Sequence, residues 1–234
     1  MKQLLILLLS VCGLSSIVNA QLEQTFALPT FNKIHYAGQG SIFLERGSAS
    51  SARVEAASTD HLENVVVEVQ DETLYIRYNL HSPDHPVFAS PRLDVYLTYE
   101  QLDAITVSGK VRIDANEPIK THQLDFHAEG FIDVNLALDV DHFHSFVEGN
   151  VSMTFSGKTQ SQNIHLEGQG SINAFDLTSH ETIATVNGTG SIYLYVKDSL
   201  EAIAGGLSKI VYKGNPVKKA FNKTGKVSIR QREI

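Results

Sequence analysis

Gly168-Gln-Gly-Ser-Ile172 returns twenty residues further on as Gly188-Thr-Gly-Ser-Ile192. Related phrases, which place an aliphatic residue four positions after a glycine, begin at Gly109, Gly130, Gly149 and Gly225, with a degenerate copy at Gly206 and an early copy at Gly38. From Gly109 to Gly188 the successive steps are 21, 19, 19 and 20 residues. A constant period of this length is typical of solenoid proteins, in which each repeat buries its apolar face against its neighbours.

Apolar residues alternate with polar ones on both sides of the repeated glycine. Four positions after it, the copies carry Ile113, Val134, Met153, Ile172, Ile192, Ile210 and Ile229. A period of two indicates strands, and a glycine between two strands indicates a bend where φ is positive or where no Cβ fits. The positions between the apolar ones hold many Ser, Thr and Asn side chains, which we expect to face solvent and which would also suit a flat carbohydrate-facing surface.

The sequence therefore predicts an all-β protein, a parallel β-helix with coils of about 19–21 residues. Like strands of successive coils would lie parallel and about 4.8 Å apart. We expect a right-handed helix, because parallel crossovers overwhelmingly take that hand. A Greek-key sandwich is the main alternative, but its strand pairing would not require one phrase to recur at constant spacing.

The chain divides into three parts by composition. Residues 1–20 resemble a signal peptide, with Lys2, an apolar run and the small residues around Asn19 before the expected cleavage site. Residues 21–30 are expected to form a loose leader segment. Residues 31–232 are expected to form one domain, less regular over 31–100 and with regular coils over 101–232. No later run has the roughly 20 apolar residues of a transmembrane helix.

This division predicts an exported protein that is periplasmic, outer-membrane-associated or secreted. Cys12, the only cysteine, lies within the expected signal peptide, so the mature chain would contain no disulfide. A lipid anchor at Cys12 is the alternative to a soluble mature chain.

The less regular part also alternates as strands. These are expected over 54–57, 65–69, 74–78 and 93–98, with a turn at 70–72. Three prolines between His81 and Pro91 indicate a loop.

The charge is distributed unevenly along the chain. Residues 197–234 hold nine Lys or Arg and three acids, whereas residues 21–196 hold nine basic and 23 acidic residues. Lysines at this end would guard the exposed last strand against edge-to-edge pairing. Alternatively, the basic end would meet an anionic surface or the acidic flank of another copy, which would permit self-association. The net charge of −7 and the expected export argue against nucleic acid as a partner.

Two groups of polar residues are candidate sites. Asp139, Asp141, His142 and His144 carry carboxylate and imidazole groups that suit zinc or another divalent ion, although Asp and His are also ordinary in the bend between two coils. His81, Asp84 and His85 form a weaker group of the same kind. We expect solvated corners and no metal or other cofactor.

Asp114 and Asp133 fall on adjacent coils in neighbouring outward columns, roughly 5–8 Å apart on the strand spacing. Paired carboxylates at such distances can cleave glycosides, and Arg112 would share their face. The sequence shows no nucleophilic triad and no phosphate-binding loop. The alternative to a binding protein is therefore a carbohydrate-active enzyme that uses these two acids.

Several phrases together resemble a known bacterial family. They are Phe31-Asn-Lys-Ile34, Leu74-Tyr-Ile76, Leu102-Asp-Ala-Ile-Thr-Val-Ser-Gly109, the two Gly-x-Gly-Ser-Ile phrases and Ile210-Val-Tyr-Lys-Gly-Asn-Pro216. The chain resembles the auto-transporter adhesin family with the head GIN domain over roughly residues 31–232. This resemblance implies an exported β-helical domain of Gram-negative bacteria without catalytic activity. It implies a binding or adhesion role toward envelope or host-surface glycans or proteins, and it transfers no site residue. An envelope scaffold that associates with itself is the remaining alternative.

Overall fold

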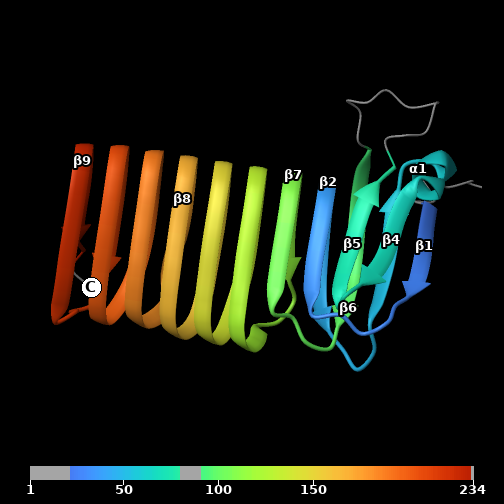
Figure 1. Ribbon diagram of the computed structural model, residues 1–234, viewed down its shortest axis with the longest axis horizontal. Coiled ribbons are helices and arrows are strands. Elements are labelled where there is room, and N and C mark those ends of the chain that lie inside the picture. The colour runs from blue at the N-terminus through green and yellow to red at the C-terminus, as the bar shows by residue number, and fades with distance from the viewer. Residues whose placement is uncertain (1–21, 80–90, 233–234) are drawn as a thin grey trace, which may run out of the picture.

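The computed structural model describes residues 22–79 and 91–232 and is mostly β, with one short helix (Figure 1). Its elements are β1 (Leu22–Ala27), β2 (Lys33–Arg46), β3 (Ser51–Ala56), α1 (Thr59–Glu63), β4 (Val65–Gln70), β5 (Thr73–Tyr78), β6 (Arg92–Tyr99), β7 (Ala104–Ala115), β8 (Ile119–Lys213) and β9 (Lys218–Gln231). The expected signal peptide at 1–20 and nearly all of the expected proline loop lie outside the described residues.

The repeated glycines bring the strands into register. β2 pairs in parallel with β7 so that Gly38 faces Gly109, and β7 pairs in parallel with β8 so that Gly109 faces Gly130. At the other end β8 pairs in parallel with β9, with Gly206 opposite Gly225. In Figure 1 the ribbon of β8 turns back on itself repeatedly between β7 and β9 along the long axis of the molecule.

Close backbone contact explains why these positions are glycine. From Gly109 to Gly225 the seven repeated glycines have φ between +76° and +118°. A Cβ built on any of them would fall inside the van der Waals contact distance of the carbonyl oxygen of the preceding glycine in the series. The expected bend without room for a Cβ is therefore confirmed, and each copy lies directly against the copy before it.

The apolar columns form the core. The aliphatic residues expected four positions after the glycine are buried from Ile113 to Ile210, and Ile229 on the last strand is partly buried against them. Phe126, Phe143 and Phe155 add an aromatic cluster, with ring centroids 6.2 Å apart for Phe126 and Phe155 and 4.8 Å for Phe143 and Phe155. The interior is thus continuous along β7 and β8.

The N-terminal end is built differently from the rest. Residues 33–37 of β2 pair in parallel with β5, and residues 39–46 pair in parallel with β6, so the two short strands together line one edge of β2. β4 pairs antiparallel with β5, and β3 pairs antiparallel with β6. The expected strands of this region and the turn at 70–72 are confirmed.

Two elements of this end differ from the expectation. Within the expected loose leader at 21–30, residues 22–27 form β1, which pairs antiparallel with β3 along its whole length. The helix α1 was not expected; the Ser58 side chain caps it by accepting a hydrogen bond from the His61 backbone N–H at 3.2 Å. Leu62 anchors the helix to the core.

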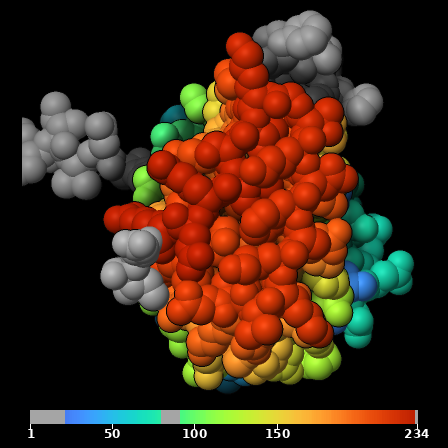
Figure 2. All heavy atoms as spheres, turned by 90° about the vertical axis from the view of Figure 1, so that its left-hand side faces the viewer, coloured from blue at the N-terminus to red at the C-terminus, as the bar shows by residue number. Residues whose placement is uncertain are grey.

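The C-terminal end is formed by β9. Most of its residues are exposed, and in Figure 2, which looks onto this end, β9 and the C-terminal part of β8 cover the face. β9 has five Lys or Arg in 14 residues. The last strand of the sheet is therefore an exposed edge with basic side chains.

Candidate binding site

The acids and histidines that the sequence grouped as a possible metal site are bound to separate partners. Asp139 lies 3.2 Å from Lys158 Nζ, and Asp141 lies 2.7 Å from His122 Nδ1. His142 Nδ1 lies 2.8 Å from Ser161 Oγ, and His144 Nδ1 lies 3.1 Å from an oxygen of Asp125. All four contacts join residues 19 positions apart, which is one step of the repeat.

Among residues 22–79 and 91–232 no group of three or more His, Cys, Asp or Glu side chains is placed to hold a metal ion. His81, Asp84 and His85 lie outside the described residues. Two other histidines on the surface of β8, His127 and His165, take part in an aromatic stack. Phe146 lies between His127 and His165, with ring centroids 5.2 Å and 4.7 Å away.

The second predicted pair, Asp114 and Asp133, lies on neighbouring strands with Arg112 between them. β7 and β8 pair so that Arg112 faces Asp133, and Asp114 faces Asn135. The Arg112 side chain donates to both oxygens of Asp114, at 2.6 Å and 3.4 Å. This hydrogen bond, together with the charges of Asp114 and Asp133, raises the pKa of the Arg112 guanidinium. Arg112 thus pairs with Asp114, and the charge of Asp133 acts on the same guanidinium.

A groove of about 460 Å³ runs across these strands and includes Asp133. β2 contributes Gln39, Gly40 and Ser41, β6 contributes Arg92, β7 contributes Lys110, Val111 and Arg112, and β8 contributes Phe131, Ile132, Asp133, Asn150 and Ser152. The groove therefore draws side chains from positions 39 to 152. Parallel pairing of β2 with both β6 and β7 brings these segments together.

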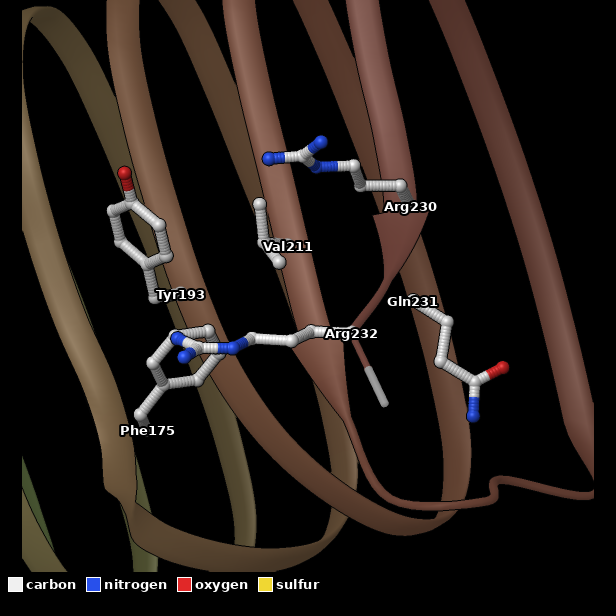
Figure 3. A pocket seen from close by; sticks show the side chains of 6 residues that line it. All are labelled: Phe175, Tyr193, Val211, Arg230, Gln231 and Arg232. Atoms are coloured by element: carbon white, nitrogen blue, oxygen red, sulfur yellow. The ribbon is translucent and has the colours of Figure 1, made fainter. Parts of the chain in front are cut away.

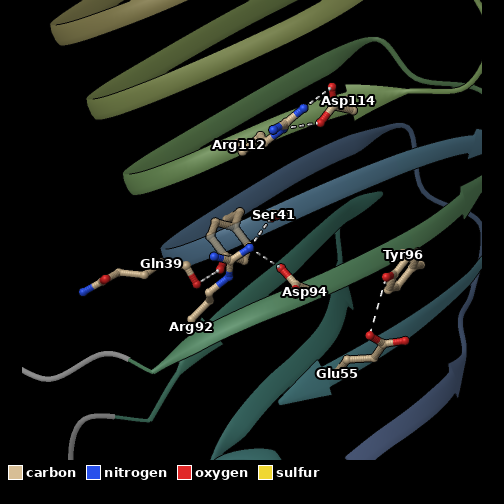
Figure 4. A network of polar contacts seen from close by, with 9 residues as sticks. Gln39, Ser41, Glu55, Arg92, Asp94, Tyr96, Arg112 and Asp114 are labelled. Atoms are coloured by element: carbon tan, nitrogen blue, oxygen red, sulfur yellow. Dashed lines mark hydrogen bonds and ion pairs between the residues drawn. The ribbon is translucent and has the colours of Figure 1, made fainter. Parts of the chain in front are cut away.

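Polar groups at the rim of the groove are held by ion pairs. The Arg92 guanidinium donates to Ser41 Oγ at 3.3 Å and to an oxygen of Asp94 at 3.4 Å (Figure 4). Figure 4 also shows Arg112 and Asp114 paired on β7, which lies on the other side of β2 from β6. Each guanidinium thus has a carboxylate beside it. The groove combines fixed donors and acceptors with little net charge.

Phe131 is the apolar feature of the groove. Its side chain is 64% exposed, which is unusual for an aromatic ring on a protein whose other large apolar residues are mostly buried. Gly40 also lines the groove, and its backbone lies so close to Leu93 that a Cβ there would overlap the Leu93 backbone. Sequence reasoning missed this site, although Phe131 and Leu207 stand out as large apolar residues directly after the repeated glycine.

The repeat, the parallel glycine register and the mostly β architecture define the class of the chain, a β-rich repeat protein. Within residues 22–79 and 91–232 no helix is long and apolar enough to cross a membrane. Residues 30–216 match the family described as "Putative auto-transporter adhesin, head GIN domain". The chain belongs to this family, as the resemblance implied.

Solved structures share the fold. A protein of Bacteroides fragilis described as a putative adhesin has 22% identity and a TM-score of 0.81, over 90% of this chain and 96% of that one. A Parabacteroides distasonis protein described as a putative lipid binding protein has 18% identity and a TM-score of 0.71, over 91% and 96%. A Parabacteroides merdae putative adhesin has 19% identity and a TM-score of 0.63 over the same shares. Among curated proteins none matches the sequence significantly.

Proposed function

We propose that this chain is an exported, non-enzymatic binding module whose regular part winds as a parallel β-helix. The parallel register of the glycines across β2, β7 and β8, and again across β8 and β9, supports this winding. The contacts between successive copies along β8 support it further. The adhesin names of the family and of the similar structures support a surface role. The apolar run in residues 1–20 supports export.

The groove around Phe131 is the proposed binding surface, and its ligand class is a glycan. A sugar ring has an apolar C–H face bordered by hydroxyl groups, so it suits an exposed aromatic ring flanked by fixed polar groups. Phe131 supplies the ring, while Arg92, Asp133 and Asn150 supply donors and acceptors around it. The single observation that carries this proposal is the 64% exposure of Phe131 within a polar groove.

The same geometry favours binding over cleavage of the glycan. A glycosidase needs one carboxyl group that donates a proton and a second one that acts as base or nucleophile. Asp114 already accepts two hydrogen bonds from Arg112, which also faces Asp133 across the strands. Asp114 is therefore held in an ion pair with Arg112, and Asp133 lies across from that arginine in an open groove.

A glycan array that includes neutral and acidic oligosaccharides tests the binding role. We expect the wild-type chain to bind at least one class of glycan, and Phe131→Ala to weaken that binding about tenfold or more. Leu207→Ala is the matched control, because Leu207 is 59% exposed at the equivalent position of another copy and lies outside the groove. Equal binding by wild type and Phe131→Ala, or no binding to any glycan, would contradict the proposal.

The non-enzymatic role has its own test. Incubation of the wild-type chain and Asp133→Asn with polysaccharides, followed by measurement of reducing ends, should show no depolymerisation by either protein. Cleavage by the wild type that Asp133→Asn abolishes would replace the binding role with an enzymatic one.

A further inference from the structure

A second concave site lies at the C-terminal end of the molecule, away from the groove at β2 and β6. It has a volume of about 300 Å³ and is lined by Phe175, Tyr193 and Val211 of β8 and by Arg230, Gln231 and Arg232 at the end of β9 (Figure 3). In Figure 3 the Arg232 side chain reaches across to Phe175, while the Arg230 side chain extends toward Val211. Val211, which lies between these side chains in the lining, is buried.

Cations at this site lie over aromatic rings. Lys209 Nζ is 5.0 Å from the centre of the Tyr193 ring, and the Arg232 guanidinium carbon is 5.5 Å from that of Phe175. Lys213 Nζ lies 4.8 Å from the Tyr195 ring and pairs with Asp176 at 3.7 Å. A ring face positions a cation without cancelling its charge.

This arrangement differs from that of the groove, where Arg92 and Arg112 are each paired with a carboxylate. Among the described residues, the cations near the C-terminal pocket form one ion pair, which joins Lys213 to Asp176. The Arg230 side chain makes no hydrogen bond or ion pair with the described residues, although its backbone lies in the β8–β9 pairing. The pocket therefore keeps a surplus of positive charge that a bound anion would neutralise.

The Tyr193 hydroxyl responds to this positive charge. A hydrogen bond from Lys209 lowers the pKa of Tyr193, and the charges of Lys209 and Arg230 and a hydrogen bond with Ser191 act in the same direction, whereas burial opposes them. The site thus already favours a negative charge on an oxygen atom at its edge.

We propose that this pocket binds the carboxylate of an acidic sugar unit, a uronate, within a glycan. A guanidinium fork matches a planar carboxylate through two parallel hydrogen bonds, which Arg230 is free to make. The aromatic walls suit the C–H face of the sugar ring. The concave shape and the volume, at the low end of ligand pockets, fit one sugar unit better than a flat lipid surface.

Calorimetry with oligogalacturonate and its methyl-esterified form tests the proposal on the chain from residue 21. We expect the wild type to bind the acidic form, with affinity that falls as salt is added, and to bind the neutral ester at least tenfold more weakly. The double variant Arg230→Gln/Arg232→Gln should lose about tenfold or more. Its matched control is Lys218→Gln/Lys219→Gln, which removes the same charge from the same strand outside the pocket.

A spectroscopic readout shows whether the ligand occupies this pocket. Bound carboxylate near Tyr193 should raise the pH at which the Tyr193 phenol ionises, and the variant without the two arginines should not show that change. If the two double variants lost the same affinity for oligogalacturonate, the proposed pocket would be wrong, and the attraction would come from the general positive charge of β9. Binding to phosphatidylglycerol vesicles without binding to oligogalacturonate would overturn the proposed pocket in favour of a membrane surface. Phe131→Ala should leave uronate binding intact, so failure here and failure of the glycan-binding groove are separable.

Discussion

At the residue scale, Gly206 and Gly205 distinguish two reasons for the absence of a side chain. A Cβ on either residue would lie 2.5 Å from an oxygen, but at Gly206 that oxygen belongs to the backbone of Gly188, and φ is +76°. At Gly205 the oxygen belongs to the side chain of Asn187, which can rotate away, and φ is not in the left-handed region.

We therefore expect Gly206→Ala to lower the free energy of unfolding by about 3 kcal/mol, from backbone strain and displacement of the neighbouring strand. Gly205→Ala should change it by no more than about 1 kcal/mol. Urea unfolding of both variants provides the comparison. Equal losses of unfolding free energy in the two variants would mean that close backbone contact is not the reason why glycine is required at position 206.

Tyrosines at opposite ends of the molecule should ionise over different pH ranges. Burial, with a smaller effect of Asp94, raises the pKa of Tyr36, whose hydroxyl donates to the Gln39 carbonyl at 2.8 Å. Tyr193 is shifted the other way by Lys209. The chain has eight tyrosines and no tryptophan, so tyrosinate absorbance follows these groups without indole background.

We expect the titration to begin below the ordinary pKa of about 10 and to extend well above it. Because Tyr193 ionises at lower pH when folded than when unfolded, its contribution to stability grows with pH below about 10 and is lost as pH falls through its folded pKa. The contribution of Tyr36 to stability depends on pH in the opposite direction, because its pKa is raised by folding. It is fully present below a pH of about 10 and is lost as the pH rises above that value. Lys209→Gln should remove the early part of the titration, and an unchanged curve would refute the assigned cause.

At the element scale, the lysines of β9 lie on an outermost strand of the sheet. β9 pairs with β8 on one side and is the last strand of the sheet order, whose other end is β1. Charged side chains on an edge strand oppose pairing with another chain. This explains the basic C-terminal end without requiring a partner for every lysine.

We expect Lys219→Thr/Lys223→Thr/Lys226→Thr to associate with itself at concentrations where the wild type is monomeric. The substitutions remove like-charge repulsion and add a residue favoured in strands. Sedimentation velocity measures the change, and the matching triple substitution with Arg should remain monomeric. A wild type that associates at low salt and dissociates at high salt would instead favour stacking of the basic end on the acidic body.

Alternation and the glycine phrase predicted β3 to β7 and the buried columns, because these features are local and periodic. They did not predict β1, whose pairing with β3 depends on a long-range contact, or α1, which is one capped turn. The groove was beyond the sequence for a similar reason. Arg92 reaches Ser41 because β6 pairs with β2, although the two residues are 51 positions apart in the sequence. Nothing in the repeat predicts that pairing.

At the scale of the whole molecule, the succession of repeat copies along the long axis determines where candidate binding surfaces lie. In the proposed β-helix each copy of the repeat would present a similar strip of surface, so that outward residues such as Phe131, or the arginines at the end of β9, would distinguish one strip from the next. The groove and the C-terminal pocket lie on different copies and differ in charge. This separation is what lets the two binding proposals be tested independently.

The central claim is that the copies of the repeat are successive coils of one parallel β-helix. The serines three positions after the repeated glycine occupy equivalent positions in different copies, so distances between them measure the spacing of the copies. Because Cys12 is the only cysteine, pairs of cysteines introduced into the chain from residue 21 can be spin-labelled without background. Spin labels at Ser152 and Ser191, two coils apart, should lie about 10 Å from each other, and labels at Ser152 and Ser228, four coils apart, about 19 Å. Distances that do not increase in proportion to the number of intervening coils would contradict the account.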